Sequence, residues 1–185
     1  MDADHPIYGV LIPRRNTPKE SVRLRALARN LRQFDSLLHA PEIATTETAA
    51  AFIPDSAPCP ALRDVAYGEW SNRTVADVAE QAPQDFQSWM VAPSSAPHGG
   101  ESFEAAQIRA AAWLESLHPK GGSTLAVTHA LVLKLLLLHV MGAPLTSVWR
   151  IDVEPLGTLT LTSDGRRWTL RSFGAGIPRE LLEKD

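Results

Sequence analysis

The strongest chemical signal in the sequence is a histidine, His129, placed between two apolar stretches. Residues 124–127 are apolar or β-branched and predict a buried strand, and residues 131–140 predict a buried helix. Polar groups at the carboxyl ends of strands face the side where α/β sheets bind ligands. A histidine there could hold or relay a proton, and the amides of the following helix favour an anion. A core histidine bonded to a backbone carbonyl is the structural alternative.

A carboxyl group, Glu101, lies in the segment Gly99-Gly100-Glu101-Ser102, immediately before a helical pattern that begins at Phe103. Ser102 is a residue type that caps helix N-termini, and the charge of Glu101 favours the same end of a helix. The segment therefore has a structural interpretation beside any chemical one.

Four short segments stand in a characteristic order: L-R-D-x-x-x-G-E-W from Leu62, F-x-x-W from Phe86, G-G-E-S from Gly99 and V-T-H-A from Val127. Together they resemble the histidine phosphatase superfamily, which includes phosphoglycerate mutases and small-molecule phosphatases, and come nearest to its α-ribazole phosphatase-like branch. The resemblance extends over residues 7–173. It implies a phosphoglycerate mutase-like α/β fold with three layers, α/β/α, and a mostly parallel sheet.

The same resemblance assigns roles to two retained positions. It implies that Glu101 is the proton donor to the leaving group and that His129 binds the transferring phosphoryl group. The family's R-H-G signature, which supplies a nucleophilic histidine, is absent. In one register Pro13, Arg14 and Arg15 occupy its three positions, and a shift by one residue still supplies no histidine.

A second family arginine is replaced as well. The family segment S-S-P-x-x-R appears here as residues 39–44, which begin with His39 and place Ala44 at the arginine position. Arg14 and Arg15 nevertheless keep positive charge near the predicted site. We therefore expect Arg14, Arg15 and His129 to form a phosphate-binding site.

This pattern has a direct chemical consequence. A guanidinium is protonated at physiological pH and has no lone pair, so Arg14 cannot form a phosphoryl intermediate. We expect a catalytically degenerate, inactive relative of phosphomonoester hydrolases that binds a small phosphorylated or anionic ligand or a protein partner. The alternative is an active phosphomonoesterase on a small cytosolic phosphate, such as an α-ribazole-phosphate-like compound, with a relocated nucleophile. His39 is the candidate for that role, whereas His98 is expected on a mobile surface loop.

The predicted strands and helices alternate along the chain, as a layered α/β domain requires. We expect one domain, residues 1–185, in which Arg14, Glu101 and His129 converge on one pocket. The predicted helices cover residues 19–33, 43–52, 75–89, 131–140 and a segment from 103. The predicted strands cover residues 8–12, 36–38, 124–127, 148–153, 158–162 and 168–173, with a hairpin turn at 163–165 near one sheet edge.

Composition excludes several classes of protein. The formal net charge of −3 favours neither nucleic acid nor an anionic membrane as a partner. A single cysteine rules out an intramolecular disulfide and suits a reducing compartment. The acidic N-terminus lacks the features of a signal peptide, and residues 131–140 are too few to span a bilayer. We expect a cytoplasmic protein with no metal and no cofactor.

Overall fold

The computed structural model describes residues 7–11, 17–30, 34–53, 56–118 and 122–174. Three positions of the altered signature, Pro13, Arg14 and Arg15, lie outside the described residues, as does the C-terminal segment 177–185. None of the helices in the described part of the chain combines the length and hydropathy that crossing a bilayer requires.

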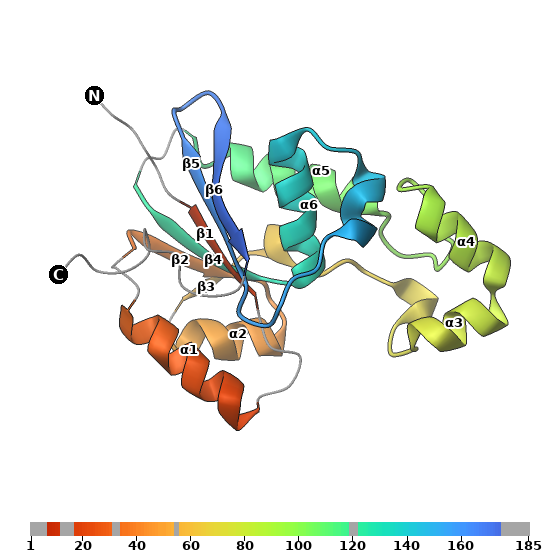
Figure 1. The fold of residues 1–185 in the computed structure, drawn as a ribbon, viewed down its shortest axis with the longest axis horizontal. Helices are drawn as coiled ribbons and strands as arrows, with labels where there is room; N and C mark the ends of the chain where they lie inside the picture. The colour runs from red at the N-terminus through yellow and green to blue at the C-terminus, as the bar shows by residue number, and fades with distance from the viewer. Residues whose placement is uncertain (1–6, 12–16, 31–33, 54–55, 119–121, 175–185) are drawn as a thin grey trace.

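A six-stranded sheet forms the middle layer (Figure 1). Its strand order is β3-β2-β4-β1-β5-β6. The first four strands in this order are parallel to one another. Strand β5 pairs antiparallel with β1, and β6 pairs antiparallel with β5. The predicted mostly parallel sheet is thus confirmed, and the hairpin at Ser163 joins the two strands at one edge. The bounds are β1 Ile7–Leu11, β2 Ser36–His39, β3 Ala57–Pro58, β4 Thr124–Thr128, β5 Thr158–Ser163 and β6 Trp168–Gly174.

The register brings the ends of three parallel strands to one edge of the sheet. Leu11 of β1 pairs with Thr128 of β4, and His39 of β2 pairs with Val127 of β4. Since parallel strands end on the same side, the segments that follow β1, β2 and β4 begin next to one another. The candidate site was predicted at this carboxyl end of the parallel strands.

Helices cover both faces of the sheet, which completes the expected three layers (Figure 1). On one face, α1 (Pro18–Asn30) and α2 (Ile43–Ala50) pack on Leu125 and Val127 of β4. On the other, α5 (Phe103–Glu115) and α6 (Ala130–Met141) pack on Ala126 of the same strand. All five residues of β4 are buried, as expected for a central parallel strand between two helical layers.

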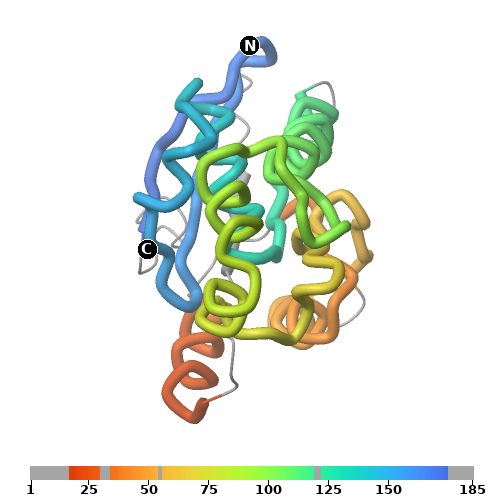
Figure 2. Tube along the Cα trace, turned by 90° about the vertical axis from the view of Figure 1, so that its right-hand side faces the viewer, coloured from red at the N-terminus to blue at the C-terminus, as the bar shows by residue number. Residues whose placement is uncertain are grey.

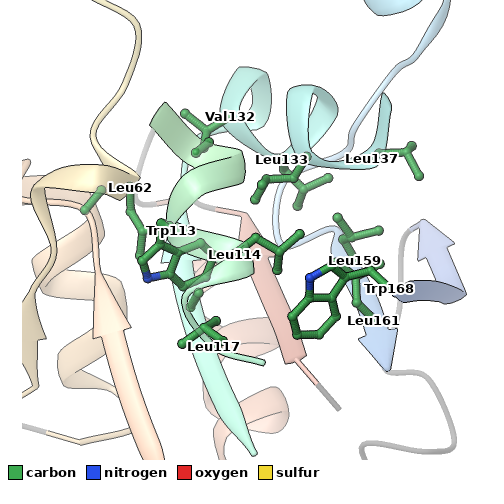
Figure 3. Packing of buried hydrophobic residues seen from close by; sticks show 14 residues of the cluster. Leu62, Trp113, Leu114, Leu117, Val132, Leu133, Leu137, Leu159, Leu161 and Trp168 are labelled. Carbon is green, nitrogen blue, oxygen red and sulfur yellow. The ribbon is translucent and has the colours of Figure 1, made fainter. Parts of the chain in front are cut away.

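The second face carries the larger apolar cluster, shown in Figure 3. Leu114 of α5 points toward Leu133 of α6, and Leu159 of β5 lies beside Trp168 of β6. These contacts join the antiparallel hairpin to the helical layer, so the hairpin extends the same core across the sheet edge.

Two helices lie outside these layers, to the right in Figure 1 and toward the viewer in Figure 2. The single helix predicted over 75–89 is wrong, because the structure has α3 (Val75–Gln81) and α4 (Pro83–Val91). Pro83 has no amide N–H and disfavours the helical conformation of Ala82, so α3 ends there and the proline starts α4. Thr74 and Asp77 form a capping box that begins α3.

The predicted strand over 148–153 is also wrong. The structure instead has a short 3-10 helix, η3 (Leu145–Arg150), which follows Pro144. Val148 is buried in it against a third apolar cluster that includes Trp89 and Leu138. Val148 is β-branched, which favoured a strand in the prediction, but η3 buries it in this cluster without pairing to a sheet. Two further 3-10 turns, η1 (Pro60–Leu62) and η2 (Gly68–Trp70), connect β3 to α3.

Candidate functional site

His129 lies where β4 ends and α6 begins, and it is the N-cap residue of α6. The preceding residue, Thr128, donates a hydrogen bond from its hydroxyl to the carbonyl of Leu62 at 2.7 Å, which fixes the end of the strand. The carbonyl of His129 accepts the amide of Leu133 in the first turn of the helix. The imidazole is thus held by a rigid junction, and its side chain is 19% exposed.

Two carboxylates flank the imidazole of His129. Its Nε2 lies 2.9 Å from Oε2 of Glu42, and its Nδ1 lies 3.5 Å from Oδ2 of Asp64. The second carboxylate oxygen of Glu42 accepts the amide of Asp64 at 3.1 Å. The site is therefore a closed arrangement of one histidine and two acids, brought together from three segments that are distant in sequence.

Two helix N-termini meet at this point. Glu42 is the N-cap residue of α2 as His129 is of α6, and neither side chain caps its own helix. They bond to each other instead. The unpaired amides and the aligned peptide dipoles make a helix N-terminus locally positive. This field favours a negative group between the two helices, and the carboxylate of Glu42 takes that position.

The environment keeps Glu42 ionised. Burial raises the pKa of its carboxyl group, but hydrogen bonds from His129 and from the backbone amides of Glu42 and Asp64 outweigh burial and lower the pKa below its usual value. At neutral pH the group is therefore a charged acceptor facing His129.

Glu101, the expected proton donor, is held in a salt bridge with two arginines. Arg109 of α5 binds both of its carboxylate oxygens, with Nε–Oε1 2.9 Å and Nη2–Oε2 2.7 Å, and Nη2 of Arg63 lies 2.9 Å from Oε1. Burial raises the pKa of Glu101, but the hydrogen bonds and charge of Arg109 and the charge of Arg63 outweigh it, so the pKa is lowered. A general acid must carry a proton at the working pH, and this environment favours the carboxylate.

Glu101 and His129 are linked through two consecutive residues. Arg63 pairs with Glu101, while the next residue, Asp64, faces His129. No direct hydrogen bond or ion pair joins Glu101 to His129 in the described structure. Their expected convergence with Arg14 stays a prediction, because Arg14 lies outside the described residues.

His39, the candidate relocated nucleophile, is 4% exposed at the end of β2. Its Nδ1 lies 2.7 Å from the carbonyl oxygen of Ala40 and its Nε2 lies 3.2 Å from that of Ser56. Both ring nitrogens are thus directed at backbone acceptors. Ala44 is exposed in the first turn of α2, two residues beyond Glu42, and has no cationic group to offer.

The surface position expected for His98 is wrong, because this side chain is fully buried. The centroid of its ring lies 5.0 Å from that of Trp70. Its Nδ1 accepts a hydrogen bond from the amide of Gly100 at 3.0 Å. A Cβ atom on Gly68 would lie 2.0 Å from the carbonyl oxygen of His98. Glycine at this position, with φ of 47°, lets the two loops touch and bury the ring. Burial lowers the pKa of His98, so the ring is neutral at pH 7.

The two depressed carboxyl pKa values predict a loss of stability in acid. Glu42 and Glu101 have folded pKa values below the unfolded value of about 4.3, so their contribution is complete above about pH 5 and is lost as pH falls through the folded pKa. We expect Glu101→Gln to be less stable than the native protein near neutrality, with the two curves converging in acid. Urea unfolding from neutral pH to about pH 3.5 measures this, with the exposed Glu104→Gln as the control. Parallel curves for Glu101→Gln and the native protein would contradict it.

Comparisons with known proteins agree with this architecture. The family model described as "Histidine phosphatase superfamily (branch 1)" matches residues 17–176. Phosphoserine phosphatase 1 of Hydrogenobacter thermophilus is 23% identical over 107 residues, which are 56% of this chain and 51% of that protein. A bifunctional protein of Mycobacterium tuberculosis, Rv2228c, is 28% identical over 108 residues, which are 56% of this chain and 30% of that protein. The chain thus spans about half or less of the length of these relatives.

Solved structures show the same fold at low sequence identity. The α-ribazole phosphatase from Shigella flexneri superimposes with a TM-score of 0.77 at 20% identity, covering 94% of this chain and 100% of that one. The mycobacterial glucosyl-3-phosphoglycerate phosphatase superimposes with a TM-score of 0.78 at 17% identity, covering 94% of this chain and 100% of that one. At these identities the likeness establishes the arrangement of strands and helices.

Proposed function

Because the chain belongs to branch 1 of the histidine phosphatase superfamily, we propose that it is a catalytically degenerate member that binds a small phosphorylated or other anionic ligand at His129 without hydrolysing it. The observation that carries this proposal is the altered signature. No histidine occurs between residues 6 and 38, and Arg14 stands three residues after the last residue of β1. A covalent route needs a nucleophile with an available lone pair, and a guanidinium has none.

The His129 site supports anion binding. His129 already forms a 2.9 Å contact with a carboxylate oxygen of Glu42, at the point where two helix N-termini favour negative charge. The carboxylate of Glu42 therefore occupies the place that an oxygen of an anionic ligand would take. Its side chain is 38% exposed, so it can turn toward solvent when such a ligand enters.

A small ligand accounts for this geometry better than a protein partner, because the imidazole is recessed at a strand end and 19% exposed. The alternative of an active phosphatase with a relocated nucleophile would need a nitrogen of His39 to reach the bound ligand. Both nitrogens instead face backbone carbonyl oxygens, and the side chain is buried.

Calorimetric titration with inorganic phosphate and with vanadate tests the proposal. We expect saturable binding that His129→Gln weakens at least tenfold, because a hydrogen bond to a charged group contributes about 1.5–3 kcal/mol. His139→Gln is the matched control, since it makes the same change on the same helix, beside Glu115 rather than Glu42. Absence of saturable binding, or equal weakening by both variants, would contradict the proposal.

Glu42 is expected to act as an internal competitor for anions. Glu42→Gln removes a negative charge 2.9 Å from Nε2 of His129 while keeping the shape of the side chain. We expect phosphate affinity to rise about tenfold, because a repulsion of a few kcal/mol at about 4 Å is partly screened in a half-exposed site. The same titration measures this, with the exposed Glu47→Gln of α2 as the control. Unchanged or weaker binding by Glu42→Gln would show that the carboxylate does not compete.

A further inference from the structure

A cavity of about 290 Å³ lies among residues of η2, α3 and α4, with Asp64 in its lining. Its walls include four aromatic side chains, those of Tyr67, Trp70, Phe86 and Trp89, which we call the aromatic pocket. This volume is just below the range typical of ligand cavities, about 300–1,000 Å³. None of the four residues takes part in the His129 contacts described above.

Asp64 connects the aromatic pocket to the His129 site. It lines the cavity, and its Oδ2 lies 3.5 Å from Nδ1 of His129. Asp64 thus borders both the His129 contacts and the cavity, and a ligand held by His129 would have to extend past its carboxylate to enter the cavity. The pocket is placed to receive the part of the ligand that the anionic group is attached to.

The walls suit a planar ring. Trp89 makes edge-to-face contacts with Trp70, at a centroid distance of 5.6 Å and an interplanar angle of 83°, and with Tyr67, at 6.4 Å and 70°. The wall rings thus pack edge-to-face on one another, and a ring placed among them can make offset or edge-to-face contacts. Trp70 and Trp89 are only 9% and 7% exposed, so their packing fixes them before a ligand arrives and little rotamer freedom is lost on binding.

Among the described residues that line the cavity, Arg73 supplies a guanidinium that fits the same ligand. Its Nη2 donates to Oε1 of Gln81 at 2.6 Å, which orients the planar group. A guanidinium stacks on an aromatic face but gains little from an aliphatic one.

We propose that the aromatic pocket binds a planar aromatic group of a ligand whose anionic group reaches His129 past Asp64. The anionic half of this ligand rests on the function proposed above. The aromatic half rests on the cavity alone.

Three phosphonates that resist hydrolysis test the proposal by calorimetry: methylphosphonate, cyclohexylmethylphosphonate and benzylphosphonate. We expect benzylphosphonate to bind at least tenfold more tightly than methylphosphonate, because a ring is buried. It should also bind about three- to tenfold more tightly than the cyclohexyl compound, which has similar bulk but no π-system.

A matched pair of variants locates the effect. Phe86→Leu keeps an apolar side chain in the pocket wall but removes the ring, and it should abolish the preference for benzyl over cyclohexylmethyl. Phe52→Leu makes the same change at a partly buried phenylalanine that packs against the apolar cluster between α1, α2 and β4 and does not line the pocket. This variant should leave the preference unchanged. In NMR spectra, the indole N–H signals of Trp70 and Trp89 should shift with benzylphosphonate, while those of Trp113 and Trp168 should not.

The outcomes separate this inference from the proposed function. If no phosphonate binds but benzyl alcohol still shifts the signals of Trp70 and Trp89, the anion site fails and the aromatic pocket stands. If benzyl and cyclohexylmethyl compounds bind equally, or Phe86→Leu leaves their ratio unchanged, the inference is overturned. It is overturned equally if benzyl alcohol and all three phosphonates leave both indole signals in place.

Discussion

Purified protein is expected to hydrolyse phosphomonoesters at less than about one thousandth of the rate of a relative that keeps the signature histidine, because loss of the nucleophile in a covalent mechanism costs several powers of ten. His129 can still hold a phosphoryl oxygen, but holding it does not replace the missing nucleophile. Phosphate release from a panel of phosphomonoesters measures the rate. Brisk hydrolysis with an acid-labile phosphoenzyme would contradict the expectation, and His39 would then be the first residue to substitute.

Restoring one residue is not expected to restore the activity. Arg14→His alone should recover little, because residues that act as a unit do not add back singly. The informative rescue combines it with Pro13→Arg, Arg15→Gly and Ala44→Arg, which rebuild the signature and the second arginine. Activity that returns only in the combined variant would agree with a degenerate family site.

The largest expected effect on stability concerns Arg109. Its guanidinium binds both oxygens of Glu101 and the carbonyls of Ala61 and Arg63, and both partners of the ion pair are almost buried, at 14% and 11% exposure. Arg109→Met should lower the free energy of unfolding by about 3 kcal/mol, because it leaves a buried carboxylate without its main partner. Urea unfolding measures the change.

Two further variants separate charge from packing in that result. Adding Glu101→Gln to Arg109→Met should recover part of the loss, since the uncompensated charge is removed. The control Arg167→Met breaks an exposed pair with Asp164 and should leave the unfolding midpoint unchanged. If Arg109→Met were as stable as the native protein, the salt bridge would not be what holds the loop before α5.

The sequence was sufficient to predict the elements whose patterns are local. Residues 124–127 carry enough apolar character to be a central strand on their own, and the glycine at 142 marks the end of α6 in a left-handed conformation. The position of His129 at the strand end follows from these two patterns. The single helix predicted over 75–89 overlooked a signal of the same local kind, because a proline after Ala82 disfavours a continuous helix.

The partners of His129 were not predictable in the same way. Glu42 lies 87 positions from His129 in the chain, and their contact depends on β2 and β4 being neighbours in a particular register. Asp64 was part of a recognised motif, but only the loop after η1 aims it at the imidazole. The burial of His98 likewise depends on two loops that approach through Gly68, a contact with no local signal.

Isotope exchange between phosphate and water tests the central claim most directly, because it needs no knowledge of the natural ligand. In a covalent histidine phosphatase, phosphate forms a phosphoenzyme with loss of one oxygen as water, and attack by solvent water then replaces that oxygen. Phosphate labelled with heavy oxygen would be incubated with the protein at a saturating concentration and followed by phosphorus NMR. We predict that phosphate binds, that His129→Gln weakens this binding, and that the label is kept at the rate of the buffer alone. Catalytic loss of the label by the native protein would contradict the account.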